Sequence, residues 1–311
     1  MLLSHEQRIL GETPCLLGGS AATRAVGVSK GRFGLSALGA LCVCAAGLLG
    51  CGENLTRDRD PVKDTEPPDL TCVPNLDGAI DADELTASIG VPASFLVSPK
   101  GELRDVNLKG TAGQDGAPVW DMAQDFASDQ QAFIEASSLK GKWYADSFPT
   151  GEFSAPADAA ASLQAVYRHT EEALYLLGLA STEEDPKQGQ TLLVYDTPIG
   201  LYQFPIEPGK QWVASGSVQN GVAYGLPYAG KDIYEVEVGP TGKLELFDYI
   251  FEQVHRVKLH VVQEPAVGAA VSTRQSQFLF ECFGEVARAT SKPDETSDDF
   301  TQAAELRRLG Q

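Results

Sequence analysis

The chain has 311 residues, of which 43 are Asp or Glu and 24 are Lys or Arg, so its formal net charge at pH 7 is -19. Proteins that bind nucleic acid take most of their affinity from Lys and Arg, which displace counterions from phosphates, so this balance excludes nucleic acid as an expected partner. Hydrophobic residues make up 43% of the chain, which is enough for a core and excludes a wholly disordered protein.

An uncharged, apolar stretch at residues 33–50 follows Lys30 and Arg32, and its length suits the core of a signal peptide or one membrane span. The stretch ends in Leu48-Leu-Gly-Cys51, which resembles the lipobox of bacterial lipoproteins. In that family a signal peptidase cuts before the cysteine, and the thiol carries a diacylglycerol. An uncleaved signal anchor is the alternative, and both interpretations attach the protein to a membrane.

The lipobox resemblance implies that residues 1–50 are a signal peptide and that Cys51 is the acylated first residue of the mature protein. The protein would then be anchored by lipid in the bacterial cell envelope. Gly52, rather than Asp, follows the cysteine, and by resemblance to the best-known sorting rule this favours the outer membrane. The region before the apolar stretch is long for a basic n-region and includes Glu6 and Glu12, which indicates that the true start lies further along the chain.

The next segment, residues 51–70, combines charges of both signs with Pro61, Pro67 and Pro68 and holds few large aliphatic side chains. Such a composition cannot bury a core, so we expect a flexible tether between the lipid and the folded body. The rest of the chain is expected to divide into a loop and short helix at 71–90, a β domain at 91–292, and an acidic tail at 293–311 with helical periodicity over 301–309.

From Pro92 onward the dominant pattern is short apolar runs with alternation of period two, separated by Gly, Pro, Asn and Asp. Consecutive strands without intervening helices predict an antiparallel meander that forms a sandwich, barrel or half-barrel, with short helices. Expected strands lie at 94–97, 131–134, 163–167, 173–179, 191–195, 211–218, 251–262 and 276–283. Weak helical periodicity marks 81–89 and 157–165.

Two details of the strand pattern predict local structure. Residues 234–238 alternate apolar and acidic side chains, and the Gly and Pro residues of 239–242 then predict a turn into a second strand at 243–247. In the run that follows, Val254 is out of phase with the later apolar positions, which predicts a bulge near His255.

The segment 73–84 resembles the calcium-binding loop of EF-hand and dockerin modules. Aligned on Gly78, four oxygen-bearing side chains fall at the third, fifth, ninth and twelfth positions, where those families place ligands. The four residues are Asn75, Asp77, Asp81 and Glu84. The resemblance implies a weakly bound structural calcium ion and no other cofactor.

The first position of that loop is Val73, where the calcium-binding families have Asp, so one direct ligand is missing. The sequence contains no second loop of this kind to pair with it. An equally supported interpretation is structural: residues 75–78 form a turn, and Asp81 or Asp83 caps a short helix.

Motifs that identify enzyme classes are missing from the sequence, among them HExxH, GxSxG, the Walker loop and GxGxxG. Beyond the lipobox the histidines are His169, His255 and His260. His255 and His260 are five residues apart, so on a regular strand they point to opposite faces and cannot bind one metal ion. We expect one or both to face solvent. The acidic runs at 183–185 and 294–299 are expected to be solvated.

The stretches 201–212 and 278–288 resemble β domains of bacterial envelope proteins, in which a Pro-x-x-x-Gly-x-x-Trp segment precedes strands that close with Gly-x-Val. The resemblance implies a curved sheet related to lipoprotein carriers, with an apolar groove, and names no catalytic residue. We therefore expect a lipid-anchored envelope protein that binds or scaffolds a protein or ligand partner. The alternatives are a carrier of lipid or another hydrophobic ligand in a half-barrel groove, and an envelope hydrolase with an unrecognised site.

Cysteine usage predicts one disulfide. Three of the six cysteines fall in the expected signal segment: Cys15, Cys42 and Cys44. Cys51 is assigned to the lipid, so Cys72 and Cys282 remain. An exported chain meets an oxidising compartment, in which a remaining pair is normally joined. Cys282 shares strand parity with Phe278 and Phe280, so we expect it to face inward.

Overall fold

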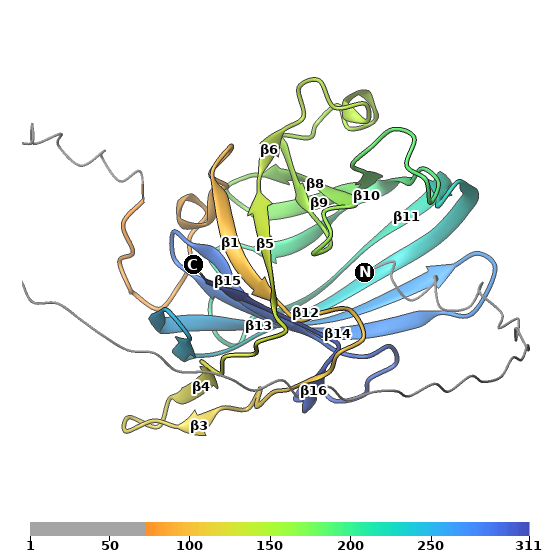
Figure 1. Cartoon of the computed structure of the whole chain (residues 1–311). Coiled ribbons are helices and arrows are strands. Elements are labelled where there is room, and N and C mark those ends of the chain that lie inside the picture. Colours follow the sequence, from red (N-terminus) through yellow and green to blue (C-terminus); the bar gives the residue numbers. More distant parts are fainter. Residues whose placement is uncertain (1–71, 311) are drawn as a thin grey trace, which may run out of the picture. The chain divides into compact units, whose positions relative to one another are not determined.

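In the computed structural model, residues 72–310 are described, and nearly all of their regular structure is β-strand (Figure 1). The expected signal peptide at 1–50, the lipid site at Cys51 and the tether at 51–70 lie outside the described residues. Helical structure within 72–310 consists of two short 3-10 turns, η2 (Asp83–Leu85) and η3 (Ala145–Ser147). The prediction of a mainly β protein with short helices is confirmed.

The strands are short in the first half of the described chain and long in the second. The first group is β1 (Pro92–Val97), β2 (Arg104–Asp105), β3 (Thr111–Ala112), β4 (Pro118–Met122), β5 (Gln130–Glu135), β6 (Ser137–Ser138), β7 (Phe153–Pro156), β8 (Leu163–His169) and β9 (Ala173–Ser181). The second group is β10 (Leu192–Gln203), β11 (Gln211–Ala223), β12 (Leu226–Leu246), β13 (Ile250–Pro265), β14 (Val271–Phe280), β15 (Gly284–Thr290), β16 (Gln302–Ala303) and β17 (Glu305–Leu309).

One 15-stranded sheet has the order β5-β1-β17-β15-β14-β13-β12-β11-β10-β9-β8-β7-β6, with β3 and β4 attached beside β12. From β7 to β15 each strand pairs antiparallel with the next, as the meander prediction requires. The edge strands β5 and β6 are separated in sequence by Ala136 alone, yet β5 pairs with β1 and β6 pairs with β7. Because one chain segment belongs to both edges, the sheet is nearly closed into a barrel (Figure 1).

The largest hydrophobic core lies on the inner face of this sheet. In β12 the side chains of Tyr234, Val236 and Val238 belong to the core, whereas Glu235 and Glu237 point to the other face. Alternation of period two along β12 therefore places its apolar residues inside and its acids outside.

The outer face of the sheet is covered in two places by segments outside the meander. Trp120 of β4 packs edge-on against Phe278 of β14, with ring centroids 5.1 Å apart. Near η3, Tyr144 and Phe148 pack on Val166 of β8 in a third cluster. Burial on both faces explains why several strands are apolar at consecutive positions rather than at alternate ones.

The hairpin predicted at 239–242 is wrong. β12 runs through this segment, because Gly239 and Pro240 form a bulge at which the register against β13 shifts. Gly and Pro mark a bulge in a strand as readily as they make a turn, so the pattern alone did not separate the two. The bulge predicted near His255 is confirmed: β13 has a second register shift that includes Gln253, whose φ is 55°.

The helix predicted at 301–309 is also wrong. Residues 305–309 form β17, which lies between β1 and β15 in the sheet. Leu306, Arg307 and Arg308 are each 2% exposed, so this part of the chain is not a solvated tail. Backbone partners on both sides of β17 override a weak helical periodicity.

The two other segments predicted to be helical form turns. The segment 81–89 contains only the single turn η2. The segment 157–165 is a turn followed by the start of β8, because the Asp158 carboxylate accepts hydrogen bonds from the backbone N–H groups of Ser162 and Leu163. Such side-chain bonds favour turns over helix interiors.

Candidate functional site

A groove of about 390 Å³ opens on the outer face of strands β11 to β14. Six acidic or basic side chains line it: Glu235, Glu237, Lys258, His260, Arg274 and Asp298. Val213 of β11, which is strongly exposed, adds an apolar surface to its wall. None of the described residues that line the groove is Ser, Thr or Cys.

Strand register brings these charges together. Glu235 of β12 lies opposite His260 of β13, and His260 lies opposite Arg274 of β14. In the next outward-facing row Glu237 lies opposite Lys258. Residues directly opposite one another in an antiparallel sheet project from the same face, so the two rows form a ladder with its carboxylates on β12 and its bases on β13 and β14.

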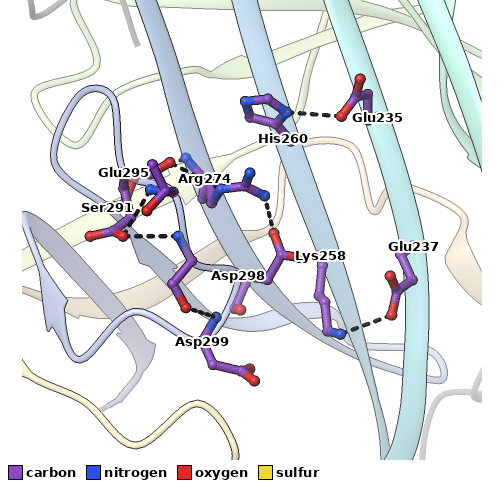
Figure 2. Close-up of polar contacts among 12 residues, drawn as sticks. Glu235, Glu237, Lys258, His260, Arg274, Ser291, Glu295, Asp298 and Asp299 are labelled. Carbon is purple, nitrogen blue, oxygen red and sulfur yellow. Dashed lines mark hydrogen bonds and ion pairs between the residues drawn. The ribbon is translucent and has the colours of Figure 1, made fainter.

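Each base in the ladder has a carboxylate partner (Figure 2). His260 Nδ1 lies 2.8 Å from Glu235 Oε2, and Lys258 Nζ lies 2.8 Å from Glu237 Oε1. Arg274 forms an ion pair with Asp298. Glu235 and Glu237 keep 55% and 41% of their side-chain surface exposed, so the pairs are screened by solvent and contribute little to folding.

A loop over residues 291–299 forms one rim of the groove and is held by two arginines. Arg274 Nε donates to the Glu295 carbonyl at 3.0 Å, as Figure 2 shows. Arg256, which is buried, donates from Nη1 to Asp299 at 2.7 Å and from Nη2 to the Asp298 carbonyl at 3.0 Å. The acidic run at 294–299 was expected to be solvated, but part of it anchors this loop to the sheet.

The calcium-like loop uses its oxygens locally. Asn75 Oδ1 accepts the Asp77 N–H at 2.8 Å, Asp77 Oδ1 accepts the Ala79 N–H at 3.0 Å, and Glu84 Oε2 accepts the Asp81 N–H at 2.9 Å. Within residues 72–310, no group of three or more His, Cys, Asp or Glu side chains is arranged to hold a metal ion. The turn at 75–78 is confirmed, whereas the cap by Asp81 or Asp83 is wrong, because the residue before η2 is Ala82 and makes no side-chain cap hydrogen bond. With their oxygens used in these local bonds the four residues do not fit a calcium ion as they stand, and calcium binding stays a prediction.

The same loop packs against one end of the closed sheet. Ile80 exchanges backbone hydrogen bonds with Ile206, and both side chains are fully buried in the inner core. Leu76 N–H donates to Glu281 Oε2 at 2.8 Å. Burial raises the pKa of Glu84, and the nearby charge of Glu281 adds to that rise. The loop is therefore a structural closure of the sheet.

The predicted disulfide between Cys72 and Cys282 is confirmed, with the two Cα atoms 5.6 Å apart. It joins the first described residue to the turn between β14 and β15. The reason given for its inward direction is wrong, however, because β14 ends at Phe280 and Cys282 lies in the turn with φ 65°.

The two histidines of β13 point to opposite faces, as predicted. His260 lies in the groove, and His255 lies on the inner face, where it is fully buried. The prediction that one or both face solvent is therefore met by His260, whose side chain is 22% exposed, and not by His255. Neither of its ring nitrogens has a hydrogen-bond partner among the described residues, and burial lowers its pKa to about 4.

Comparison with family models, with curated proteins and with solved structures found no match. No helix among residues 72–310 is long and apolar enough to cross a membrane. The function of the chain must therefore be argued from its sequence and from the geometry described above.

Proposed function

We propose that the protein is a lipid-anchored protein of the bacterial cell envelope, and that its β domain binds a partner rather than catalysing a reaction. The observation that carries the proposal is the disulfide between Cys72 and Cys282. Disulfides persist in oxidising compartments and are rare in reduced cytosol. This bond supports export, and export is what the lipobox resemblance at Cys51 implies.

The position of the bond also supports an anchored protein. Cys72 comes directly after the expected tether at 51–70, so the disulfide fastens the folded body at the point where the tether reaches it. The strongly negative charge of the chain disfavours contact of the body with anionic headgroups. We therefore expect the body to be held away from the bilayer by its tether, on the outer membrane by the sorting rule for Gly52.

The groove is the surface that we assign to partner binding. Its bases and carboxylates lie on one face and remain partly exposed, so a partner of mixed charge can exchange ion pairs with them at small desolvation cost. The exposed side chain of Val213 supplies an apolar contact beside these charges.

The test of anchoring is incorporation of labelled fatty acid in cells that express the full chain. We expect Cys51→Ala to leave an uncleaved precursor without label, because the acylated thiol is gone. Cys44→Ala is the matched control, since it removes a thiol from the same apolar stretch, and it should be labelled like the wild type. Processing and labelling of Cys51→Ala at the wild-type level would contradict the proposal.

One observation favours a second candidate, an envelope hydrolase. The contact between Glu235 and His260 could orient an imidazole as a general base. The described groove residues supply no nucleophile beside it, so a water molecule would have to serve. A screen of ester and amide substrates decides: turnover by the wild type that is lost in His260→Ala supports the hydrolase, and its absence supports binding.

A further inference from the structure

The inner face of the sheet carries a row of polar side chains on β14, β15 and β17 among its apolar neighbours. Gln277 of β14 lies opposite Arg288 of β15, and Arg288 lies opposite Arg307 of β17. Opposite residues of antiparallel strands project from the same face, so these three side chains form one row across three strands.

Tyrosines from the facing strands reach this row. The Tyr202 hydroxyl of β10 donates to Gln277 Oε1 at 2.5 Å. Tyr167 of β8 stacks on Phe153, with ring centroids 5.3 Å apart. Burial raises the pKa of Tyr167, and the positive charges of Arg288 and Arg307 oppose that rise.

The two guanidinium groups share one contacting carboxylate. Arg288 donates from Nε to Glu285 Oε2 at 2.8 Å and from Nη2 to the same oxygen, while Arg307 Nη2 lies 3.2 Å from Glu285 Oε1. Glu305, in the neighbouring row, acts on both arginines through its charge, without an ion pair to either among the described residues.

Arg307 is the less compensated of the two cations. Its side chain is 3% exposed, and its Nε has no hydrogen-bond partner among the described residues. Burial lowers the pKa of Arg307, and repulsion by Arg288 adds to that effect. A buried donor on a cation is costly to leave without an acceptor, so the row has an unused hydrogen-bond donor that an acceptor oxygen could occupy.

We propose that this row binds the oxyanion of a small ligand, a carboxylate or a phosphate group, between Arg288 and Arg307. Guanidinium groups present paired donors that match such oxygens. Access exists on one side, because the side chains of Arg288 and Glu285 keep 22% and 17% of their surface exposed. This inference is independent of lipid anchoring and of the groove.

The test is isothermal titration of the full chain, purified in a non-ionic detergent, with inorganic phosphate and separately with acetate. We expect at least one of the two anions to bind at a single site, and the anion that binds identifies the group recognised. Arg288→Gln should weaken that binding at least about tenfold, because charged hydrogen bonds to the anion are lost.

Arg168→Gln is the matched control. Arg168 follows Tyr167 in β8, points to the opposite face and lies over the Tyr175 ring at 5.0 Å. The affinity of the Arg168→Gln variant for the anion should equal that of the wild type. Arg288 is chosen over the more buried Arg307 so that the variant folds, which thermal unfolding verifies. No binding of either anion to the wild type, or equal affinity in folded Arg288→Gln, would overturn the proposal.

Discussion

On the outer face of β12 to β14, each base of the groove has its own carboxylate and keeps contact with solvent. On the inner face of β14, β15 and β17, two guanidinium groups share Glu285, and one of them is almost fully buried. The charged groups on the outer face therefore lose little hydration free energy on folding, whereas those on the inner face lose much more. Charge that is costly to bury is where a substitution, a change of pH or a ligand should have the larger effect.

We expect the largest loss in the free energy of unfolding from the disulfide, which attaches the loop at 73–84 to one end of the sheet. Replacing both Cys72 and Cys282 with Ala removes a link between residues separated by 210 positions. By the loop-entropy relation such a link stabilises by at most about 5 kcal/mol. Urea unfolding of the wild type and the double variant measures the loss. A difference below about 1 kcal/mol would show that the end of the sheet covered by this loop is stable without the disulfide.

Glu285→Gln should have the next largest effect, because it removes the carboxylate that both inner arginines contact. We expect a loss of about 3 kcal/mol in the free energy of unfolding, as for other buried pairs that lose one partner. The contrast between the two faces fails if this loss is no larger than that of an equivalent substitution in the groove.

His255 gives the inner side a dependence on pH. A histidine in the unfolded chain titrates near 6.5, whereas burial holds the pKa of His255 at about 4. As the pH falls from about 6.5 to 4, the unfolded chain takes up a proton that the folded chain does not, so folding stability is lost in that window.

The expected loss from His255 is about 3 kcal/mol, and the group contributes no further change below pH 4 or above pH 6.5. His255→Leu should remove this dependence, which unfolding curves at several pH values measure. At pH 7 the variant should be at least as stable as the wild type, because two unpartnered polar atoms are gone. An unchanged pH profile in His255→Leu would assign the dependence to another group.

Among the charge substitutions, we expect one in the groove to change the free energy of unfolding least. Glu237→Gln breaks the pair with Lys258 at the surface, and we expect it to cost less than about 1 kcal/mol. The same unfolding assay as for Glu285→Gln makes the comparison direct. A loss as large as that of Glu285→Gln would show that the ion pairs of the groove contribute as much to stability as the buried ones.

The calcium-like loop should show the smallest effect of added ligand. We expect calcium to bind the wild type weakly or not at all, in the range of about 10⁻³ to 10⁻⁴ M or above. Val73→Asp restores the missing first ligand and should raise the affinity. Isothermal titration of both forms measures this, and binding by the wild type at about 10⁻⁵ M or tighter would contradict the structural interpretation of the loop.

The sequence was sufficient for the fold class and for the disulfide, because both follow from local properties: alternation in strands such as β12, and the number of cysteines after the expected lipobox. It failed at Gly239 and at 301–309, where the outcome depends on neighbouring strands: β13 accompanies both halves of β12, and β1 and β15 enclose β17. Neither the groove nor the inner row could be predicted. Glu235, His260 and Arg274 meet only through register, which the sequence does not state.

We propose above all that the mature protein begins with an acylated cysteine. It is tested most directly by mass spectrometry of the N-terminal peptide from protein purified from membranes. We predict a peptide that begins at Cys51 and carries the mass of a diacylglycerol. A peptide that begins upstream of Cys51, with that thiol unmodified, would contradict the account.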